Sequence, residues 1–450
     1  MLRNRPPMKS RSCLSPFLAF CALSIYATAE PEPSAAAAGR PLNIGRLLDT
    51  GRPVKIVCFG DSITGVYYHT GGRRAWCDLL GIALKRIYPK AQIEMINAGI
   101  AGHNTIHALK RMDADVLSHH PQLVVVMFGM NDSYGISPEA YRANLGQIVE
   151  RARAGEAEVI LMTPNTIYPD YPRYPNWRLE KFAEIVRRVG RELDVPVADC
   201  FRAYQTIQAV DDRAWVRLMN DTIHPNLRGH KVFAEEVAWT ISGRRVSLAE
   251  LPSLQPGLPK VLARLKGQQP VTIVAMKPYD RLIGPALQSL FPGAEVQVIT
   301  WDSDRKSLEE IEAPLKLRMD VVERAIVEGR GKDIDSWKFL DHKIFGHPDL
   351  VLLAVPADAL APSGEQFHRS YNAILDHCAG VENPSSECLA ILPSVAQPEL
   401  NQAQRTAENL ALDVILGRNF PWLQRSPGDG ATAADLLTQR LATLLGLEKP

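Results

Sequence analysis

The sequence has almost no net charge, and this excludes one large class of partner. Its 51 lysines and arginines stand against 50 aspartates and glutamates, which leaves a formal charge of +1. The sequence contains no block of basic residues that could neutralise a phosphate backbone, so we expect no nucleic-acid partner. With 46% hydrophobic and 22% charged residues, the composition is that of a globular protein.

Cysteine is also scarce. The chain has seven cysteines and no Cys-x-x-Cys pair, and Cys13 and Cys21 lie within the first 29 residues. The remaining cysteines are odd in number, so the sequence predicts neither a zinc site nor a disulfide scaffold, and leaves open one disulfide whose partners it does not identify. His103 and His107 have the i, i+4 spacing of metal ligands on a helix, but no third ligand accompanies them. We therefore expect no metal and no cofactor.

Long apolar runs are missing except near the N-terminus, where the pattern is that of an export signal. A basic start is followed by the mostly apolar stretch Leu14 to Tyr26 and then by Ala27-Thr28-Ala29, a small-x-small cleavage pattern. The apolar stretch is short for a membrane span. We expect residues 1–29 to be a signal peptide cleaved near Ala29 and the mature protein to be secreted or periplasmic, with no stable membrane span. An uncleaved anchor is the alternative.

A chain of 450 residues has room for two domains. Residues 30–42 are rich in Ala and Pro and predict a flexible lead-in, followed by a first domain over residues 43–247. Pro252, Pro256 and Pro259, followed by Pro270, mark residues 248–269 as a linker, and a second, smaller α/β domain is expected over residues 270–450.

The first domain alternates short apolar runs with amphipathic stretches. The apolar runs show no period-two alternation, as expected of parallel strands covered on both faces. The expected strands are Val54–Phe59, Ile93–Ile96, Leu123–Phe128, Val159–Met162 and Val195–Ala198. The expected helices are Trp76–Tyr88, Thr105–Leu117, Tyr141–Ala154, Arg178–Leu193 and Gly229–Ile241. This alternation predicts a three-layer, flavodoxin-like α/β fold around a parallel sheet.

The second half repeats the pattern of the first. Val271–Val274 echoes Val54–Val57, and later segments correspond in the same order: Phe291-Pro292 to Tyr88-Pro89, His347–Val351 to His120–Val124, and Glu387–Pro393 to Glu158–Pro164. The conserved order favours a duplicated, degenerate copy of the first domain. The alternative is that any two α/β domains show this degree of sequence similarity.

Four short blocks in the first domain carry polar or glycine residues where a predicted strand or segment ends, the edge at which sites form in parallel sheets. They are Gly60-Asp61-Ser62, Asn97 to Gly102, Gly129 to Asp132 and Asp221 to His224. Each alone is typical of a turn or a helix cap. Together they offer a serine hydroxyl on a tight turn, oxyanion donors, and a carboxylate three residues before an imidazole, which returns both to one side of a turn.

In these blocks the sequence resembles the SGNH (GDSL) hydrolase family, named for its Ser, Gly, Asn and His. The resemblance covers about Pro53 to Ile241. It implies that Ser62 is the nucleophile and that His224 is its base.

The same resemblance implies roles for three further residues. Asp221 would orient His224, while the Ser62 N–H, the Gly102 N–H and the Asn131 side chain would form the oxyanion hole. Many members have Ser-Gly-Asp where this chain has Ala101-Gly102-His103. This departure leaves Gly99 as an alternative oxyanion donor, but we favour Gly102.

Substrate contacts are expected from Asp61, His103, Asp132 and Trp177. Trp177 ends a loop, Thr163 to Trp177, in which tyrosines alternate with prolines and which would suit stacking on sugar rings. Packing of a rigid surface loop explains the loop equally well, and Asp132 has helix capping as its alternative role.

These observations predict a secreted serine esterase that hydrolyses carboxylic esters, in particular O-acetyl groups on carbohydrate, through an acyl-enzyme. The partner would be a small-molecule or carbohydrate ester, and the oligomeric state is left open. The alternatives are a lysophospholipase or lipase of the same family and a non-catalytic polysaccharide-binding protein. The second half has Lys277-Pro278-Tyr279 in place of Gly-Asp-Ser, so we expect it to be non-catalytic.

Overall fold

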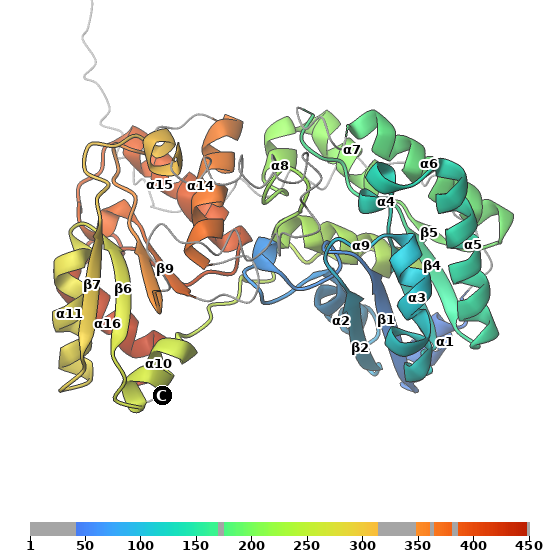
Figure 1. Cartoon of the computed structure of the whole chain (residues 1–450), viewed down its shortest axis with the longest axis horizontal. Coiled ribbons are helices and arrows are strands. Elements are labelled where there is room, and N and C mark those ends of the chain that lie inside the picture. The colour runs from blue at the N-terminus through green and yellow to red at the C-terminus, as the bar shows by residue number, and fades with distance from the viewer. Residues whose placement is uncertain (1–41, 170–174, 314–347, 361–363, 380–385, 448–450) are drawn as a thin grey trace, which may run out of the picture. The chain divides into compact units, whose positions relative to one another are not determined.

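The computed structural model describes residues 42–169, 175–313, 348–360, 364–379 and 386–447 (Figure 1). The expected signal peptide and nearly all of the expected lead-in lie outside these residues, as do Tyr171 and Tyr174 of the aromatic loop. In the part described, no helix combines the length and the apolar character that crossing a membrane requires.

The first sheet has five parallel strands in the order β2-β1-β3-β4-β5. The strands are β1 (Pro53–Gly60), β2 (Gln92–Gly99), β3 (Leu123–Met127), β4 (Glu158–Met162) and β5 (Val197–Ala198). This order is that of a doubly wound, flavodoxin-like sheet, so the predicted fold class is confirmed. All five residues of β3 are buried, which explains its continuous apolar run.

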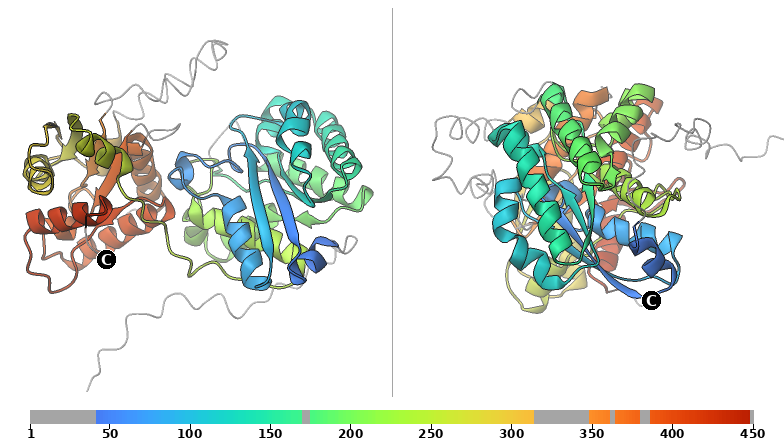
Figure 2. Two further views of the ribbon diagram at one scale, coloured as in Figure 1. Left: turned by 90° about the horizontal axis from the view of Figure 1, so that it is seen from below. Right: turned by 90° about the vertical axis from the view of Figure 1, so that its right-hand side faces the viewer.

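Helices cover both faces of this sheet (Figure 2). The helices are α1 (Ile44–Asp49), α2 (Trp76–Ile87), α3 (Thr105–Asp115), α4 (Met130–Gly135), α5 (Pro138–Ala154), α6 (Asn176–Glu192), α7 (Cys200–Val210), α8 (Asp212–Val216) and α9 (Leu227–Ser242), with short 3-10 turns η2 (Tyr68–Thr70) and η3 (Leu117–His119). One core joins α1, α2 and α9 to the sheet, and another joins α3 and α5. The result is the expected three-layer sandwich.

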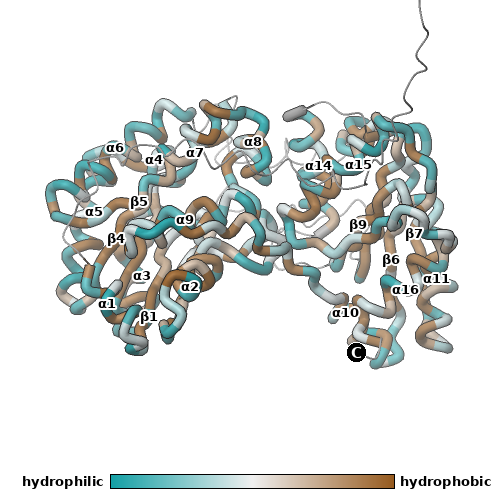
Figure 3. The backbone as a smooth tube through the Cα atoms, turned by 180° about the vertical axis from the view of Figure 1, so that it is seen from behind, coloured by the Kyte–Doolittle hydropathy of each residue, from teal (hydrophilic) through white to brown (hydrophobic). Residues whose placement is uncertain are grey.

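Helices such as α5 and α6 alternate between hydrophilic and hydrophobic residues, as amphipathic helices do (Figure 3). The region between residues 198 and 221 differs from expectation, because it forms α7 and α8. Asp199 starts α7 by accepting a hydrogen bond from the Arg202 N–H. The short α1, α4 and α8 were not expected either, since five or six residues are too few to show a helical period.

The second sheet is also parallel, in the order β10-β9-β8-β6-β7. Its strands are β6 (Val271–Met276), β7 (Val296–Trp301), β8 (Leu350–Leu353), β9 (Glu387–Ile391) and β10 (Trp422–Leu423). Its helices are α10 (Pro259–Lys266), α11 (Tyr279–Leu290), α14 (Gly364–Ala379), α15 (Gln402–Gly417) and α16 (Ala433–Leu444), with a 3-10 turn η5 (Pro393–Val395). It has a core of its own. In chain order the strands are arranged as in the first sheet, which supports the expected second α/β domain.

The two domains share a detail that an arbitrary pair of α/β domains need not have. In the first, the Glu158 carboxylate at the start of β4 accepts hydrogen bonds from the Asn43 N–H at 2.6 Å and the Ile44 N–H at 2.7 Å, where α1 begins. In the second, Glu387 at the start of β9 accepts from the Lys260 and Val261 N–H groups at 2.9 and 3.0 Å, in the first turn of α10. A carboxylate at a helix N-terminus is stabilising in both places. This shared arrangement favours duplication.

The start of the second domain lies earlier than the sequence indicated. The stretch 248–269 was expected to be a linker, yet α10 spans Pro259–Lys266 and buries Val261 and Leu265 in the second core. Proline is well suited to the first position of a helix, because its missing N–H would have had no partner there. A proline-rich composition therefore hid a helix.

Candidate active site

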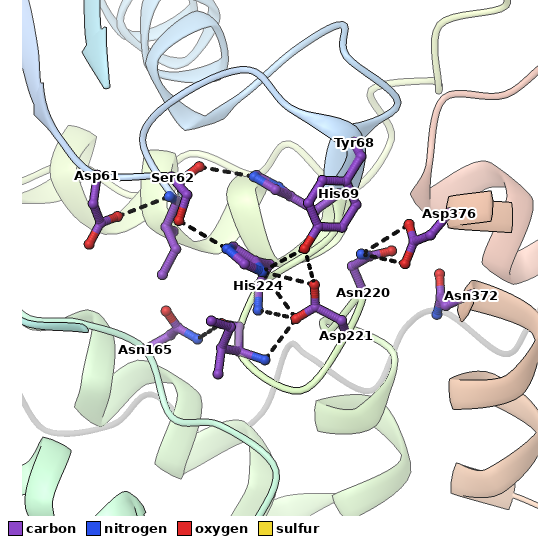
Figure 4. A network of polar contacts seen from close by, with 12 residues as sticks. Asp61, Ser62, Tyr68, His69, Asn165, Asn220, Asp221, His224, Asn372 and Asp376 are labelled. Carbon is purple, nitrogen blue, oxygen red and sulfur yellow. Dashed lines mark hydrogen bonds and ion pairs between the residues drawn. The ribbon is translucent and has the colours of Figure 1, made fainter. Parts of the chain in front are cut away.

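The four sequence blocks meet at the carboxyl-terminal edge of the first sheet. Ser62 follows β1, Gly102 follows β2, Asn131 lies in the first turn of α4 after β3, and His224 precedes α9. The Ser62 Oγ lies 2.9 Å from the His224 Nε2 (Figure 4). The serine and the imidazole, 162 residues apart in sequence, are thus within hydrogen-bond distance.

The turn that carries Ser62 is fixed by its own backbone. The Asp61 carbonyl accepts from the N–H groups of Thr64 and Gly65 at 3.1 and 3.0 Å, and the Asp61 Oδ1 accepts from the Ile63 N–H at 2.9 Å. Gly60 has no room for a side chain, because a Cβ there would lie 2.0 Å from the Thr64 Oγ1. Within the described residues the Ser62 N–H makes no hydrogen bond, which leaves it available to a ligand.

The residues from Asp221 to His224 form a small hydrogen-bonded loop. The Asp221 Oδ1 accepts from the backbone N–H groups of Ile223 and His224, both at 2.8 Å. The other oxygen, Oδ2, lies 2.8 Å from the His224 Nδ1. The Asn220 N–H donates to the His224 carbonyl at 2.8 Å and closes the loop. The carboxylate thereby holds the imidazole with its Nε2 toward Ser62.

Charge pairing overcomes burial in this pair. Burial alone would raise the pKa of Asp221, but the His224 charge and hydrogen bonds from His224 and Tyr68 hold the pKa of Asp221 well below its usual range. Burial alone would likewise lower the pKa of His224, but Asp221, with smaller contributions from Asp61 and Asp376, raises the pKa of the imidazole. Asp221 is therefore ionised near neutral pH.

The imidazole of His224 is the first of three stacked rings, and the other two belong to His69 and His230. The His69 ring stacks on His224 with centroids 4.9 Å apart and on His230 at 5.3 Å. The Trp76 N–H donates to the His230 Nδ1, so the proton of His230 is on Nε2, which donates to the His69 Nδ1 at 3.3 Å. The proton of His69 is then on its own Nε2 and is donated to the Ser62 carbonyl at 2.9 Å.

Burial keeps this pair of supporting histidines neutral. It lowers the pKa of His69 well below its usual range, with further lowering by the neighbouring His224 and His230. It also lowers the pKa of His230 to about 3. Two neutral rings with one defined tautomer each therefore connect the Trp76 backbone to the Ser62 backbone.

Tyr68 joins the Asp221–His224 pair, a contact that sequence reasoning missed. Its hydroxyl donates to the Asp221 Oδ2 at 2.6 Å and lies 3.1 Å from the His224 Nδ1. Burial raises the pKa of Tyr68 well above its usual range, and the nearby Asp221 carboxylate adds to this, so the hydroxyl keeps its proton. A tyrosine in a loop has no spacing pattern that would reveal such a contact, and closeness to Ser62 in sequence was the only available signal.

Gly102 is better placed than Gly99 to offer a backbone N–H. The Gly99 N–H donates to the Asn97 Oδ1 at 2.9 Å, and a Cβ at Gly99 would lie 2.2 Å from the Gly65 nitrogen. Gly102 has a φ of +73° and open space around it, and its N–H makes no hydrogen bond within the residues described. The Asn131 Nδ2 donates to the His103 carbonyl at 2.9 Å, which ties the third block to the second.

Two of the expected substrate contacts have mainly backbone partners. Asp132 is fully buried and accepts from the Thr105 N–H at 2.8 Å, the Thr105 hydroxyl at 2.5 Å and the Gly129 N–H at 3.0 Å. It therefore fastens the first turns of α3 and α4 to each other, as its alternative role of helix capping implies. Asp61, only 2% exposed, stabilises the Ser62 turn in the same way.

The other two expected contacts are more accessible. Trp177 is 60% exposed at the start of α6, and its ring faces the Lys181 ammonium at 4.8 Å. The His103 ring stacks on His107 at 4.7 Å. Among the described residues no group of three or more His, Cys, Asp or Glu side chains is arranged to hold a metal ion.

The five cysteines within the described ranges are all buried and free: Cys58, Cys77, Cys200, Cys378 and Cys388. Burial raises the pKa of the Cys58 thiol and that of the Cys200 thiol well above the usual range of cysteine. These thiols therefore behave as small core side chains rather than as nucleophiles.

Comparison with known proteins gives a consistent picture of the first domain. Residues 58–232 match the sequence model of the GDSL-like Lipase/Acylhydrolase family. An acetylxylan esterase of Geobacillus stearothermophilus is 26% identical over 163 residues, which cover 34% of this chain and 73% of that protein. A protein of Escherichia coli K12 named thioesterase 1/protease 1/lysophospholipase L1 is 28% identical over 184 residues, or 41% of this chain and 81% of that protein.

One solved structure aligns with part of this chain. The crystal structure of an acetylxylan esterase from Geobacillus stearothermophilus aligns with a TM-score of 0.37 at 22% identity, covering 42% of this chain and 94% of the other. The family match ends before the second sheet begins.

Proposed function

We propose that this chain, whose first domain is related to the GDSL-like lipases and acylhydrolases, hydrolyses carboxylic esters with Ser62 as nucleophile. One observation carries the proposal: the Ser62 Oγ, the His224 imidazole and the Asp221 carboxylate form a continuous hydrogen-bonded chain, with links of 2.9 and 2.8 Å. A serine hydroxyl is a weak nucleophile until an adjacent base takes its proton, and the His224 imidazole is that base.

The reaction follows from the positions of these groups. His224 Nε2 takes the proton as Ser62 Oγ attacks the ester carbonyl carbon, and the developing oxyanion is stabilised by the N–H groups of Ser62 and Gly102 and by the Asn131 amide. His224 then gives the proton to the leaving alcohol. Water, activated by the same imidazole, attacks the acyl-enzyme and releases the acid and free Ser62.

The favoured substrate is an O-acetyl group on a carbohydrate. An acetylxylan esterase is among the relatives, the export pattern of residues 1–29 would bring the protein to extracellular polysaccharide, and the exposed Trp177 offers a surface for a sugar ring. The second candidate is a lysophospholipase-type activity, which the name of the Escherichia coli relative favours. A purely polysaccharide-binding role has less support, because the Ser-His-Asp chain is complete.

A fluorophosphonate probe and an ester series test this proposal. We expect the probe to label Ser62, and kcat/KM for p-nitrophenyl esters to be highest for acetate and to fall as the acyl chain lengthens. Acetate release from acetylated xylan should follow. A maximum at eight or more carbons would favour the lysophospholipase reading, and absence of both labelling and hydrolysis would contradict an esterase.

The pH dependence of kcat/KM should show an acid limb above pH 6.5. His224 acts as a base only when neutral, and its pKa is raised above the ordinary value of about 6.5, so activity is lost as pH falls through that higher pKa. His69 and His230 are neutral in this range and do not contribute charge. The measurement is kcat/KM for p-nitrophenyl acetate between pH 5 and 9.

Asp61→Asn tests one of the smaller causes of the raised pKa of His224. Burial raises the pKa of Asp61 to about 7, so this carboxyl group carries the negative charge that raises the pKa of His224 only at about pH 7 and above. An asparagine oxygen can still accept from the Ile63 N–H, so the turn is retained while the charge is removed. Because Asp221 raises the pKa of His224 more than Asp61 does, the acid limb should move only slightly, and to lower pH; a limb that moves to higher pH would contradict the assignment.

A further inference from the structure

Two first-domain segments that carry the site are held by residues of the second domain. The first is the 68–71 segment, which includes η2. The Arg418 Nη2 donates to the Tyr68 carbonyl at 2.7 Å, and the Asn419 Nδ2 donates to the Thr70 carbonyl at 3.1 Å. Gly71 has a φ of +65°, and a Cβ there would lie 2.1 Å from the Arg418 carbonyl oxygen. The segment is therefore fitted closely against the end of α15.

The second segment is 217–228, which contains Asp221 and His224. Its Met219 carbonyl accepts from the His368 Nε2 of α14 at 2.9 Å. Asp413 of α15 pairs with Arg217 at 2.7 Å and also with Arg228. Two second-domain helices thus contact the loop that presents the imidazole.

Arg418 connects the two segments. Its side chain is fully buried and pairs with Asp376 of α14 at 2.5 Å. The Asn220 Nδ2, next to Asp221 in sequence, lies 3.4 Å from the Asp376 Oδ2 (Figure 4). A buried guanidinium is costly unless it is paired and hydrogen-bonded, and here its partners include Asp376 and the backbone of the residue that contacts the Asp–His pair.

We propose that the second domain is a working part of the active site: it positions Tyr68, and the Tyr68 hydroxyl positions the Asp221–His224 pair. The proposal rests on the esterase function proposed above. The Asp221 Oδ2 is shared by the His224 Nδ1 and the Tyr68 hydroxyl, so the tyrosine restricts rotation of the carboxylate. Tyr68 itself is held by Arg418. The second half, which has Lys277-Pro278-Tyr279 where the first has Gly60-Asp61-Ser62, thereby acts on the chemistry of the first.

Tyr68→Phe tests the last link without removing a buried charge. We expect kcat per active site to fall about ten- to hundredfold with KM unchanged, since small misplacement of a catalytic group has effects of this order. Active sites are counted by fluorophosphonate titration, so that inactive protein does not enter kcat. A general loss of folded protein would lower the titre and leave kcat per site unchanged.

Arg418→Met tests the link between domains, with Arg425→Met as its matched control. Arg425 donates to the carbonyls of Ser394, Val395 and Asp429 within the second domain. The control should therefore lower thermal stability while leaving kcat per site within about twofold. Arg418→Met should lower kcat per site by about as much as Tyr68→Phe.

The double variant decides whether Arg418 acts through Tyr68. If it does, the Tyr68→Phe/Arg418→Met protein will be no slower than the slower single variant. Multiplied losses, or wild-type kcat in Tyr68→Phe, would overturn the positioning role while wild-type hydrolysis still upholds the esterase. Wild-type protein whose Ser62 is neither labelled nor active would instead overturn the proposed function, and this role with it.

Discussion

Replacing Ser62 or His224 by alanine should each lower kcat for short-chain esters by about 10⁶-fold, because in serine hydrolases nucleophile and base act as a unit. The Ser62 Oγ lies 2.9 Å from the His224 Nε2, so removing either group leaves no activated nucleophile. The remaining rate would come from substrate binding and the oxyanion donors alone. The measurement is initial-rate hydrolysis of p-nitrophenyl acetate by purified variants.

The double variant Ser62→Ala/His224→Ala should be no slower than either single one, since each change already disables the unit. Ser118→Ala is the matched control, because the Ser118 hydroxyl is exposed and donates to the Ala114 carbonyl. It should keep wild-type kcat. Turnover of Ser62→Ala within tenfold of wild type would show that another group performs the chemistry.

The layout of the first domain could be predicted because each of its signals is local. A buried parallel strand such as β3 is a continuous apolar run, and a polar block after it lies at the edge where sites form. The Asp221–His224 contact is equally local, since three residues of spacing are enough to close the loop. Ser62, Asn131 and His224 could therefore be placed at one edge from sequence alone.

The parts that could not be predicted depend on contacts between distant residues. His69 and His230 are 161 residues apart, and their hydrogen bond has no sequence pattern. Arg418 contacts Tyr68 across 350 residues. Such contacts are fixed by packing rather than by periodicity. The α10 helix was missed for another reason, because prolines that mark a linker are also compatible with the start of a helix.

The second domain repeats the topology of the first, but its strand ends carry different residues. Where Ser62 follows β1, Tyr279 begins α11 after β6, and burial raises the pKa of its hydroxyl well above its usual range. The hydroxyl therefore stays protonated, and within the described residues no base accepts its proton, so nothing activates it as a nucleophile. The second domain would instead contribute to the chemistry through its contacts with the first domain, as Arg418 and Asp376 indicate.

Asp221→Asn should lower kcat by about 10⁴-fold, the effect known for the equivalent change in a serine protease triad. Both carboxylate oxygens of Asp221 accept hydrogen bonds: Oδ1 from backbone N–H groups, and Oδ2 from the His224 Nδ1 and the Tyr68 hydroxyl. An asparagine must turn its NH₂ toward one of these sets. Because the backbone donors hold the oxygen, the NH₂ would face His224, and the imidazole would carry its proton on Nε2, where it cannot act as a base.

The measurement is kcat for p-nitrophenyl acetate together with the rate of Ser62 labelling, which should fall in parallel. Asp211→Asn is the matched control, since Asp211 is an exposed cap whose carboxylate accepts from the Arg213 N–H, a role that asparagine fills equally well. The control should keep wild-type kcat and labelling. If Asp221→Asn retains more than a tenth of wild-type kcat, the carboxylate does not set the tautomer of His224, and the Ser62–His224 contact must operate without it.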